Sequence, residues 1–235
     1  MEFTIDLVTV FKIAREESDL AKTEIDTLGP LAAYQRSTQR HDERLARAPD
    51  AQTLACKVGC AWCCSFSVDI RPVEAFNILQ FMEVSVNGDE KKQICSEMAA
   101  NSAILSGLDD LERMRQTLKC PFLIQNQCSI YEARPQTCRN YHATDSAGCK
   151  QSFYEPDNTD IPPDFAPGIY QAGGAHVEAF SKAMLAAGYD NAAYELSSAM
   201  LELMTDSESA RLRFEGKLPV FLTTEGTDVT PELID

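Results

Sequence analysis

The sequence lacks any apolar run long enough to cross a membrane. A spanning helix needs about 18 consecutive apolar residues, and no stretch of the 235 residues approaches that length. The amino-terminal stretch MEFTIDLVTVFKIAREESD also lacks the basic region and small-residue cleavage site of a signal peptide, because it carries Glu2 and Asp6 instead. These absences predict a cytoplasmic protein without membrane contacts.

Basic residues are also scarce. The chain has 21 Lys and Arg against 36 Asp and Glu, a net charge of −15, which argues against general nucleic-acid binding. The few aromatic residues do not interleave with basic ones, so single-strand binding has no support either. GxxxxGK[ST], GxGxxG, HExxH and GxSxG are all missing. The usual signatures of nucleotide, zinc-protease and serine-hydrolase sites therefore do not apply.

Helical periodicity covers both ends of the chain, while prolines interrupt the middle. Residues 120–168 hold six prolines, which exclude long helices there. The stretch 65–70, SFSVDI, alternates like a short strand. We therefore expect a mainly α fold with at most a short β pair. The predicted helices are 5–27, 31–48, one from Pro72 to about 84, 89–118 with a break at 106–107, 175–187, 191–204, and a short one from Thr205 with a TDSE capping box.

Composition divides the chain into four parts. Segment 1–50 is an N-terminal helical segment, 51–155 a cysteine-cluster metal-binding domain, 156–217 a set of C-terminal helices packing on it, and 218–235 an acidic, loosely held tail. Irregular segments bury little apolar surface for the entropy they lose. Another interaction should therefore hold the middle of the chain, and the cysteines are concentrated there.

Four arginines recur at helical spacing, and one glycine pair stands out. Arg36, Arg40, Arg44 and Arg47 form a stripe that could dock an acidic partner or a phosphate-bearing ligand. We favour a solvated face that pairs with local and distant carboxylates. Gly173-Gly174 is interpreted as a flexible loop before a helix, in preference to an anion-binding nest.

Nine cysteines are the most informative feature. Cys95 falls in the apolar rhythm of a helix and is expected to be a small buried hydrophobe. A cytoplasmic address keeps thiols reduced, so the other eight suit metal binding or catalysis better than disulfides. They form two groups along the chain: Cys56, Cys60, Cys63 and Cys64, then Cys120, Cys128, Cys138 and Cys149.

The spacing within the first group is typical of metal ligands. Cys60 and Cys63 form a C-x-x-C step, which lets two thiolates bind one ion from a tight turn. Cys64 points away from Cys63 if the backbone is extended, so the pair suits two different ions. Eight thiolates match two tetrahedral sites, one polynuclear cluster, or one iron–sulfur cluster with spare thiols. His142 could replace one thiolate, whereas His41 and His176 are treated as non-ligands. A redox role for the C-x-x-C pair alone would not need the second group.

Three stretches of the sequence resemble a known family. CKVGCAWCC, SVDIRPVEAFNI and CPFLIQNQCSIYEARPQTCRNYHATDSAGC are similar to the bacterial YkgJ-like, or CxxCxxCC, cysteine-cluster proteins, described as zinc- or iron-chelating domains. The resemblance covers about residues 52–153, and the first spacing departs from it as C-x3-C. The resemblance implies a set of ligands: Cys56, Cys60, Cys63, Cys64, Cys120, Cys128, Cys138 and Cys149. A cysteine that corresponds to Cys149 occurs in some members of the family. The same cluster occurs in flagellin lysine methylases, which implies iron–sulfur chemistry as an alternative.

Residues between the cysteines should support the site. Tyr131, with Phe122, Leu123 and Ile130, is expected to wall it with apolar surface. Arg134 and Arg139 would offset thiolate charge, although Arg134 could equally pair with Glu132 or a backbone carbonyl.

The sequence therefore predicts a metal-binding protein, with zinc as first choice and iron or an iron–sulfur cluster as second. A structural zinc module, an iron enzyme with a pocket near Tyr131, Arg134, Tyr141 or His142, and a metal buffer or delivery protein remain as alternatives. The partner would be an unidentified protein or small molecule.

Overall fold

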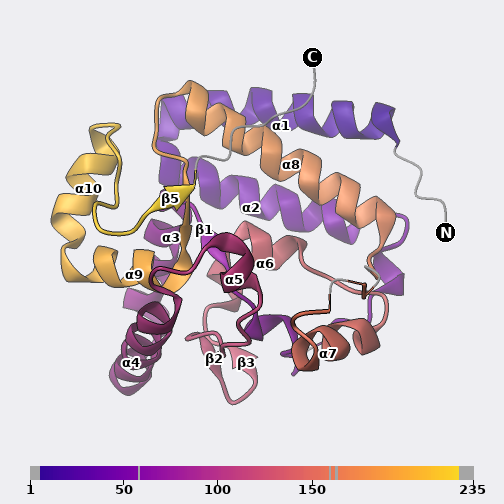
Figure 1. Cartoon of the computed structure of the whole chain (residues 1–235). Coiled ribbons are helices and arrows are strands. Elements are labelled where there is room, and N and C mark those ends of the chain that lie inside the picture. The colour runs from indigo at the N-terminus through magenta and orange to yellow at the C-terminus, as the bar shows by residue number, and fades with distance from the viewer. Residues whose placement is uncertain (1–5, 58, 159, 162–163, 228–235) are drawn as a thin grey trace.

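The computed structural model describes residues 6–57, 59–158, 160–161 and 164–227. Helices dominate these ranges (Figure 1), which confirms the mainly α prediction. No helix in them is both long and apolar enough to cross a bilayer.

Two groups of helices enclose the core. One group contains three long helices that pack on one another across the top of Figure 1: α1 (Leu7–Leu28), α2 (Pro30–Ala46) and α8 (Pro167–Ala186). The other contains α3 (Pro72–Ser85), α4 (Gly88–Leu105), α9 (Leu196–Thr205) and α10 (Ser207–Glu215). The largest side chains buried between them are Tyr34, Ile78, Met82, Ile94, Met98, Met184, Met200 and Leu203.

Short elements connect these helices. They are η1 (Ala51–Thr53), η2 (Cys63–Ser65), β1 (Asp69–Ile70), α5 (Asp110–Met114), β2 (Leu123–Ile124), β3 (Gln127–Cys128), η3 (Tyr131–Ala133), α6 (Gln136–Asn140), α7 (Ser146–Tyr154), β4 (Ala193–Glu195) and β5 (Gly226–Thr227). The strands pair antiparallel as β1-β4-β5 and as the β2-β3 hairpin. Strand pairing is therefore more extensive than the single short pair predicted, because two-residue strands leave little periodicity in the sequence.

Backbone-setting residues begin and end several helices as predicted. Gly29 has φ +84°, which lets the chain reverse between α1 and α2. Pro30 and Pro72 are the first residues of α2 and α3, where a missing N–H costs nothing. Gly107, with φ +80°, separates α4 from α5 at the predicted break.

The start of α8 was predicted wrongly. It begins at Pro167, and Gly173-Gly174 lies inside it, so this pair is neither a loop nor an anion nest. A Cβ at Gly173 would collide with the side chain of Asn140 on α6. Gly173 therefore allows α6 to pack closely on α8.

The carboxyl-terminal elements also differ from the prediction. α9 starts at Leu196, after β4, and the N-cap of α10 is Asp206 rather than Thr205. Residues 218–227 are not loosely held, since Val220 and Phe221 are buried. Residues 228–235 of the predicted tail lie outside the described ranges.

A buried polar network joins α1, α2 and α8. Glu17 has no exposed surface and accepts hydrogen bonds from Arg40, Arg44 and Ser37. His176 of α8 bonds to Ser37 and Arg44. Arg40 and Arg44 are thus largely shielded and do not form the solvated face that we predicted, although their partners are distant carboxylates as expected.

The network gives a pH-dependent stability. Burial lowers the pKa of His176 to about 3; the charge of Glu17 opposes this, while those of His41, Arg44 and Arg40 add to it. Because the ordinary value is 6.5, the neutral ring stabilises the fold fully above pH 6.5 and this contribution disappears as the pH falls toward 3.

We therefore expect His176→Gln to flatten the pH dependence of stability. Between pH 6.5 and 4, the free energy of unfolding of the unsubstituted protein should fall more steeply, by up to about 1.4 kcal/mol per pH unit. Urea unfolding at several pH values measures this. Equal slopes would show that His176 does not titrate in this window.

Candidate metal centre

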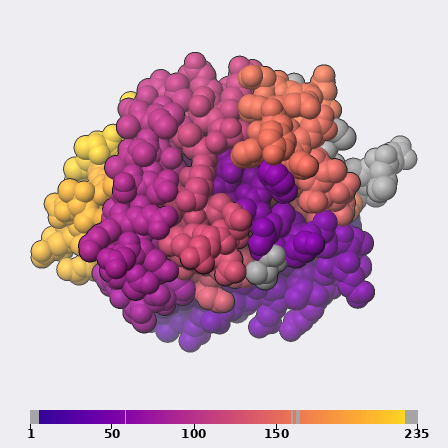
Figure 2. Space-filling view, turned by 90° about the horizontal axis from the view of Figure 1, so that it is seen from below, coloured from indigo at the N-terminus to yellow at the C-terminus, as the bar shows by residue number. Residues whose placement is uncertain are grey.

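The eight cysteines of the two groups lie on three separate chain segments. Figure 2 shows these segments side by side: the segment near residues 50–65 lies between the 100–130 region and the 146–160 region. All nine cysteines of the chain are free, so no disulfide holds these segments.

A hydrogen bond and a hairpin bring Cys64, Cys120 and Cys128 together. The Cys120 N–H donates to the Cys64 carbonyl at 2.7 Å. The β2–β3 hairpin then pairs Leu123 with Cys128. Its two turn residues both have positive φ, as a tight two-residue hairpin turn requires.

Cys138 lies on α6, whose position is fixed by a buried carboxylate. Glu74 Oε1 accepts a hydrogen bond from the Gln136 N–H at 2.8 Å and one from the Tyr34 hydroxyl at 3.3 Å. Its Oε2 accepts from the Arg71 N–H at 2.7 Å. Glu74 is only 2% exposed, so it ties α6 to α2 and α3. Sequence reasoning missed this role, although Glu74 lies within the RPVEAF stretch.

Cys56 and Cys149 come together through a different set of contacts. The Ala55 N–H donates to the Ala143 carbonyl at 2.9 Å, and the Ala143 N–H points at the Cys56 sulfur at 3.3 Å. Cys149 follows on α7, which packs against η2.

Aromatic rings hold α7 on the cysteine loop. Trp62 packs on Phe153 at 5.4 Å and on Tyr154 at 5.9 Å between ring centroids. Trp62 stands between Cys60 and Cys63 in the sequence. The stack therefore couples the C-x-x-C loop to the helix that carries Cys149.

The thiols influence one another's pKa values in two overlapping sets. The charge of Cys64 acts on four thiols, those of Cys63, Cys120, Cys128 and Cys138. That of Cys56 acts on Cys63 and Cys149, and that of Cys60 acts on Cys149. The charge of Cys138 also raises the pKa of Cys63, so the two sets lie next to each other.

Burial and mutual repulsion raise most of these pKa values. Burial raises the pKa of Cys120 to about 12 and raises that of Cys138 further. A hydrogen bond between the neighbouring thiols raises the pKa of Cys63 and lowers that of Cys64 to about 7. Our expectation that Cys64 points away from Cys63 is wrong, because the backbone there forms the η2 turn and is not extended.

The thiols do not converge on single points. Within the described ranges, no three Cys, His, Asp or Glu side chains are close enough to hold one ion as they stand. Closing a site would therefore require the thiol side chains to move toward one another. The donor set itself, eight free thiols from three segments, is the type that zinc and iron prefer.

The two predicted supporting arginines differ in whether their N–H groups have hydrogen-bond partners within the protein. Arg139 donates to the carbonyls of Glu132 and Arg134 and to Asp42, so its N–H groups are engaged by protein. Arg134 lies over the Tyr131 ring at 3.8 Å, while its Nε and Nη1 are buried without a partner.

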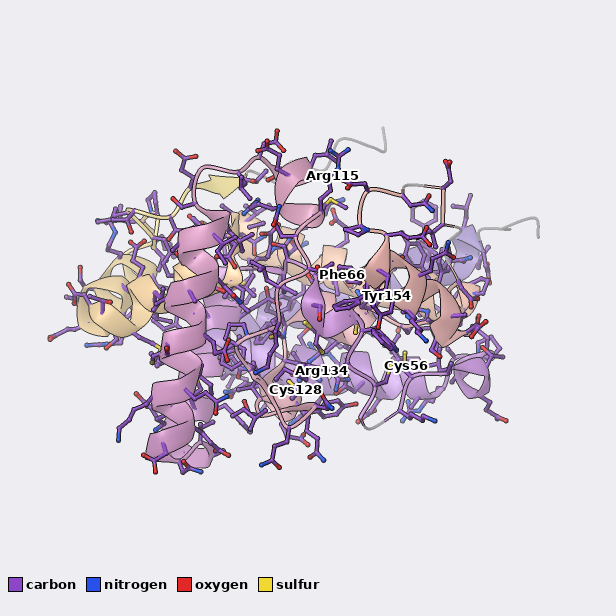
Figure 3. All side chains as sticks on the ribbon, turned by 60° about the horizontal axis from the view of Figure 1, so that its bottom comes forward. Cys56, Phe66, Arg115, Cys128, Arg134 and Tyr154 are labelled. Atoms are coloured by element: carbon purple, nitrogen blue, oxygen red, sulfur yellow. The ribbon has the colours of Figure 1, made fainter. Side chains whose placement is uncertain are left out.

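Arg134 lies next to the thiols. Burial raises the pKa of Cys128, and the charges of Arg134 and Arg139 oppose that rise. Ser129 Oγ, beside Cys128, is likewise buried without a partner. Figure 3 shows Cys128 and Arg134 together, with Cys56 and Tyr154 to one side of them. If the thiols were ionised, their sulfurs would accept hydrogen bonds from the unpartnered donors of Arg134 and Ser129.

The remaining predictions have mixed outcomes. His142 accepts from the Ala166 N–H at 3.1 Å through Nε2 and bonds to the Asn140 carbonyl at 2.7 Å through Nδ1, so both nitrogens are engaged. His142 is therefore not available as a substitute ligand.

Of the residues expected to wall the site with apolar surface, Tyr131 is 60% exposed, whereas Phe122 and Ile130 are buried. Cys95 is half-buried in α4.

Residues 55–160 match a family model, CxxCxxCC, described as "Putative zinc- or iron-chelating domain". Residues 55–160 are thus similar to CxxCxxCC domains. No curated protein and no solved structure matches the chain. The CxxCxxCC domain begins at the loop before Cys56 and ends beyond α7, so it contains all eight clustered cysteines. Metal binding of a general kind is therefore supported by the family match and is consistent with the donor set.

Proposed function

We propose that the CxxCxxCC domain binds metal through eight thiolates, with zinc as the first choice, and that the metal holds the middle of the chain in place. The ligands in this proposal are Cys56, Cys60, Cys63, Cys64, Cys120, Cys128, Cys138 and Cys149. The observation that carries it is the gathering of free thiols from three segments beside buried, unpartnered donors of Ser129 and Arg134.

A metal ion would supply what this region lacks. The segment between α5 and α8 has only short elements, and α7 contains no buried residue. Thiolate-bound zinc contributes folding free energy directly, because ligands must come together to bind it. Arg134 and Ser129 would then donate to thiolates, which lowers the cost of gathering negative charge. The proposal requires reduced thiols, as the cytoplasm maintains.

A single-substitution series tests this proposal. Cys60→Ser and Cys138→Ser should each lower metal content and shift urea unfolding to lower concentration, since each removes a ligand. Cys95→Ser, in α4, is the matched control and should retain the full metal content. Elemental analysis and unfolding of the same samples measure both. Equal metal loss in all three variants would contradict the ligand assignment.

Iron–sulfur chemistry is the second candidate. The buried donors of Arg134 beside Cys128 favour it, because hydrogen bonds to cluster sulfurs set the reduction potential of such centres. Exposed Tyr131 and Tyr141 would then stand at the mouth of a reactive site. The visible absorption spectrum separates this candidate from zinc, which is colourless.

A further inference from the structure

The supports around the eight thiols differ, and on that basis we group the thiols into two adjoining sets. We call Cys64, Cys120, Cys128 and Cys138 the inner set, and Cys56, Cys60, Cys63 and Cys149 the outer set. Each set takes cysteines from both of the groups that the sequence shows. The division runs between the adjacent residues Cys63 and Cys64.

The inner set is built on fixed supports. Cys64 and Cys120 are joined by their backbone hydrogen bond, and the hairpin places Cys128 beside them. Cys120 and Cys128 also pack against the hydrophobic core. Cys138 is held through α6 and the buried Glu74. All the supports of this set are therefore buried or hydrogen-bonded.

The inner set also has the donors that an anionic site needs. Ser129 Oγ, on the residue after Cys128, and Arg134 Nε and Nη1 are buried without partners, and the charge of Arg134 acts on Cys128. The outer set has no such buried, unpartnered donor among its neighbours in the described part of the chain. Hydrogen bonds to ligand atoms typically strengthen metal binding by about 10- to 100-fold.

The outer set has weaker supports, and one of its members is exposed to solvent. Cys56 is exposed. Cys149 lies on α7, which contributes no buried residue and contacts the cysteine loop mainly through Trp62, Phe153 and Tyr154. Tyr154 is itself 65% exposed. A competing ligand from solution can therefore reach the outer set at Cys56.

We propose that each set binds one ion and that the two ions differ in exchange: the inner ion is retained, while the outer ion exchanges with ligands in solution. This proposal rests on the proposed function and assigns a different role to each of the two sites. The inner site would maintain the fold, and the outer site would accept and release a thiophilic divalent ion such as Zn²⁺ or Fe²⁺. The outer site thus gives the metal-delivery alternative a specific location.

Trp62 provides a built-in reporter of the outer set. It is the only tryptophan of the chain and stands between two outer cysteines. Its ring packs on Phe153, one helical turn after Cys149. Closing or opening the outer site should therefore change the environment of the indole, while events at the inner set should affect it less.

The test follows metal release from the zinc-loaded full chain after addition of EDTA. We expect two phases of about one equivalent each, the first at least about tenfold faster and accompanied by the change in Trp62 fluorescence. Cys149→Ser should abolish the fast phase, remove the fluorescence change and retain about one equivalent of zinc. Cys60→Ser, which changes the cysteine loop and not α7, should behave in the same way.

Alkylation of the loaded protein with iodoacetamide gives a readout that does not depend on variants. Peptide mass analysis should find Cys56, Cys60, Cys63 and Cys149 modified before the inner four. A single release phase with uniform alkylation, or loss of all zinc in both variants, would overturn the two-site proposal while leaving metal binding intact. A chain that takes up no metal at all would instead refute the proposed function.

Discussion

Replacement of Glu17 by alanine should lower the free energy of unfolding by about 3–5 kcal/mol, the range for breaking a buried ion pair by removing one partner. Glu17 has no exposed surface and accepts hydrogen bonds from Arg40, Arg44 and Ser37. Burial alone would raise its pKa, but the hydrogen bonds from Arg40 and Ser37 and the charges of His176 and Arg40 hold it below its ordinary value. Without the carboxylate, Arg44 loses its buried carboxylate partner and Arg40 keeps only Glu24.

The neighbouring residue Glu16 is the matched control. It lies 3.5 Å from Arg44 but is half exposed, so Glu16→Ala should cost less than about 1 kcal/mol. Urea unfolding followed by circular dichroism measures both variants. Equal effects of the two substitutions would show that the network between α1, α2 and α8 carries no special stability.

Replacement of Glu74 by alanine should destabilise the fold and weaken the metal centre together. Three donors would lose their acceptor: the Tyr34 hydroxyl and the backbone N–H groups of Gln136 and Arg71. Each buried donor left unsatisfied costs about 1–3 kcal/mol, so we expect a total loss of at least about 3 kcal/mol. Because Gln136 begins α6, Cys138 should also lose its fixed position.

Metal affinity distinguishes positioning from stability alone. Competition with a chromogenic zinc chelator should show weaker binding in Glu74→Ala, by about 10- to 100-fold as for other residues that orient ligands. Glu83→Ala is the control, since Glu83 is exposed on the same helix. If Glu74→Ala loses stability but binds zinc as tightly as the control, Glu74 does not position Cys138.

The helices were largely predictable because local signals determine them. Pro30 and Pro72 begin helices where the sequence indicates. The predictions failed where a long-range contact decides the structure. Gly173 looks like a loop residue, yet it lies in α8 because the side chain of Asn140 packs against it. No local pattern in the sequence indicates that Asn140 lies against Gly173.

The cysteines show the same limit at the site. Their spacing identifies eight candidate ligands, but it groups Cys63 with Cys64 and separates Cys64 from Cys120. Cys63 and Cys64 do share a turn and a hydrogen bond, but a backbone hydrogen bond also joins Cys64 to Cys120, which the spacing does not indicate. Arg134 and Arg139 looked equivalent in the sequence, whereas only Arg134 keeps buried N–H groups without partners.

Elemental analysis of protein purified without oxygen, together with a count of reactive thiols on the same sample, measures whether the clustered cysteines hold metal. We expect about two zinc ions per chain, or iron with a visible spectrum, and a thiol count that rises when a chelator removes the metal. A metal-free chain whose cysteines all react at once, with unchanged stability after chelator treatment, would contradict it.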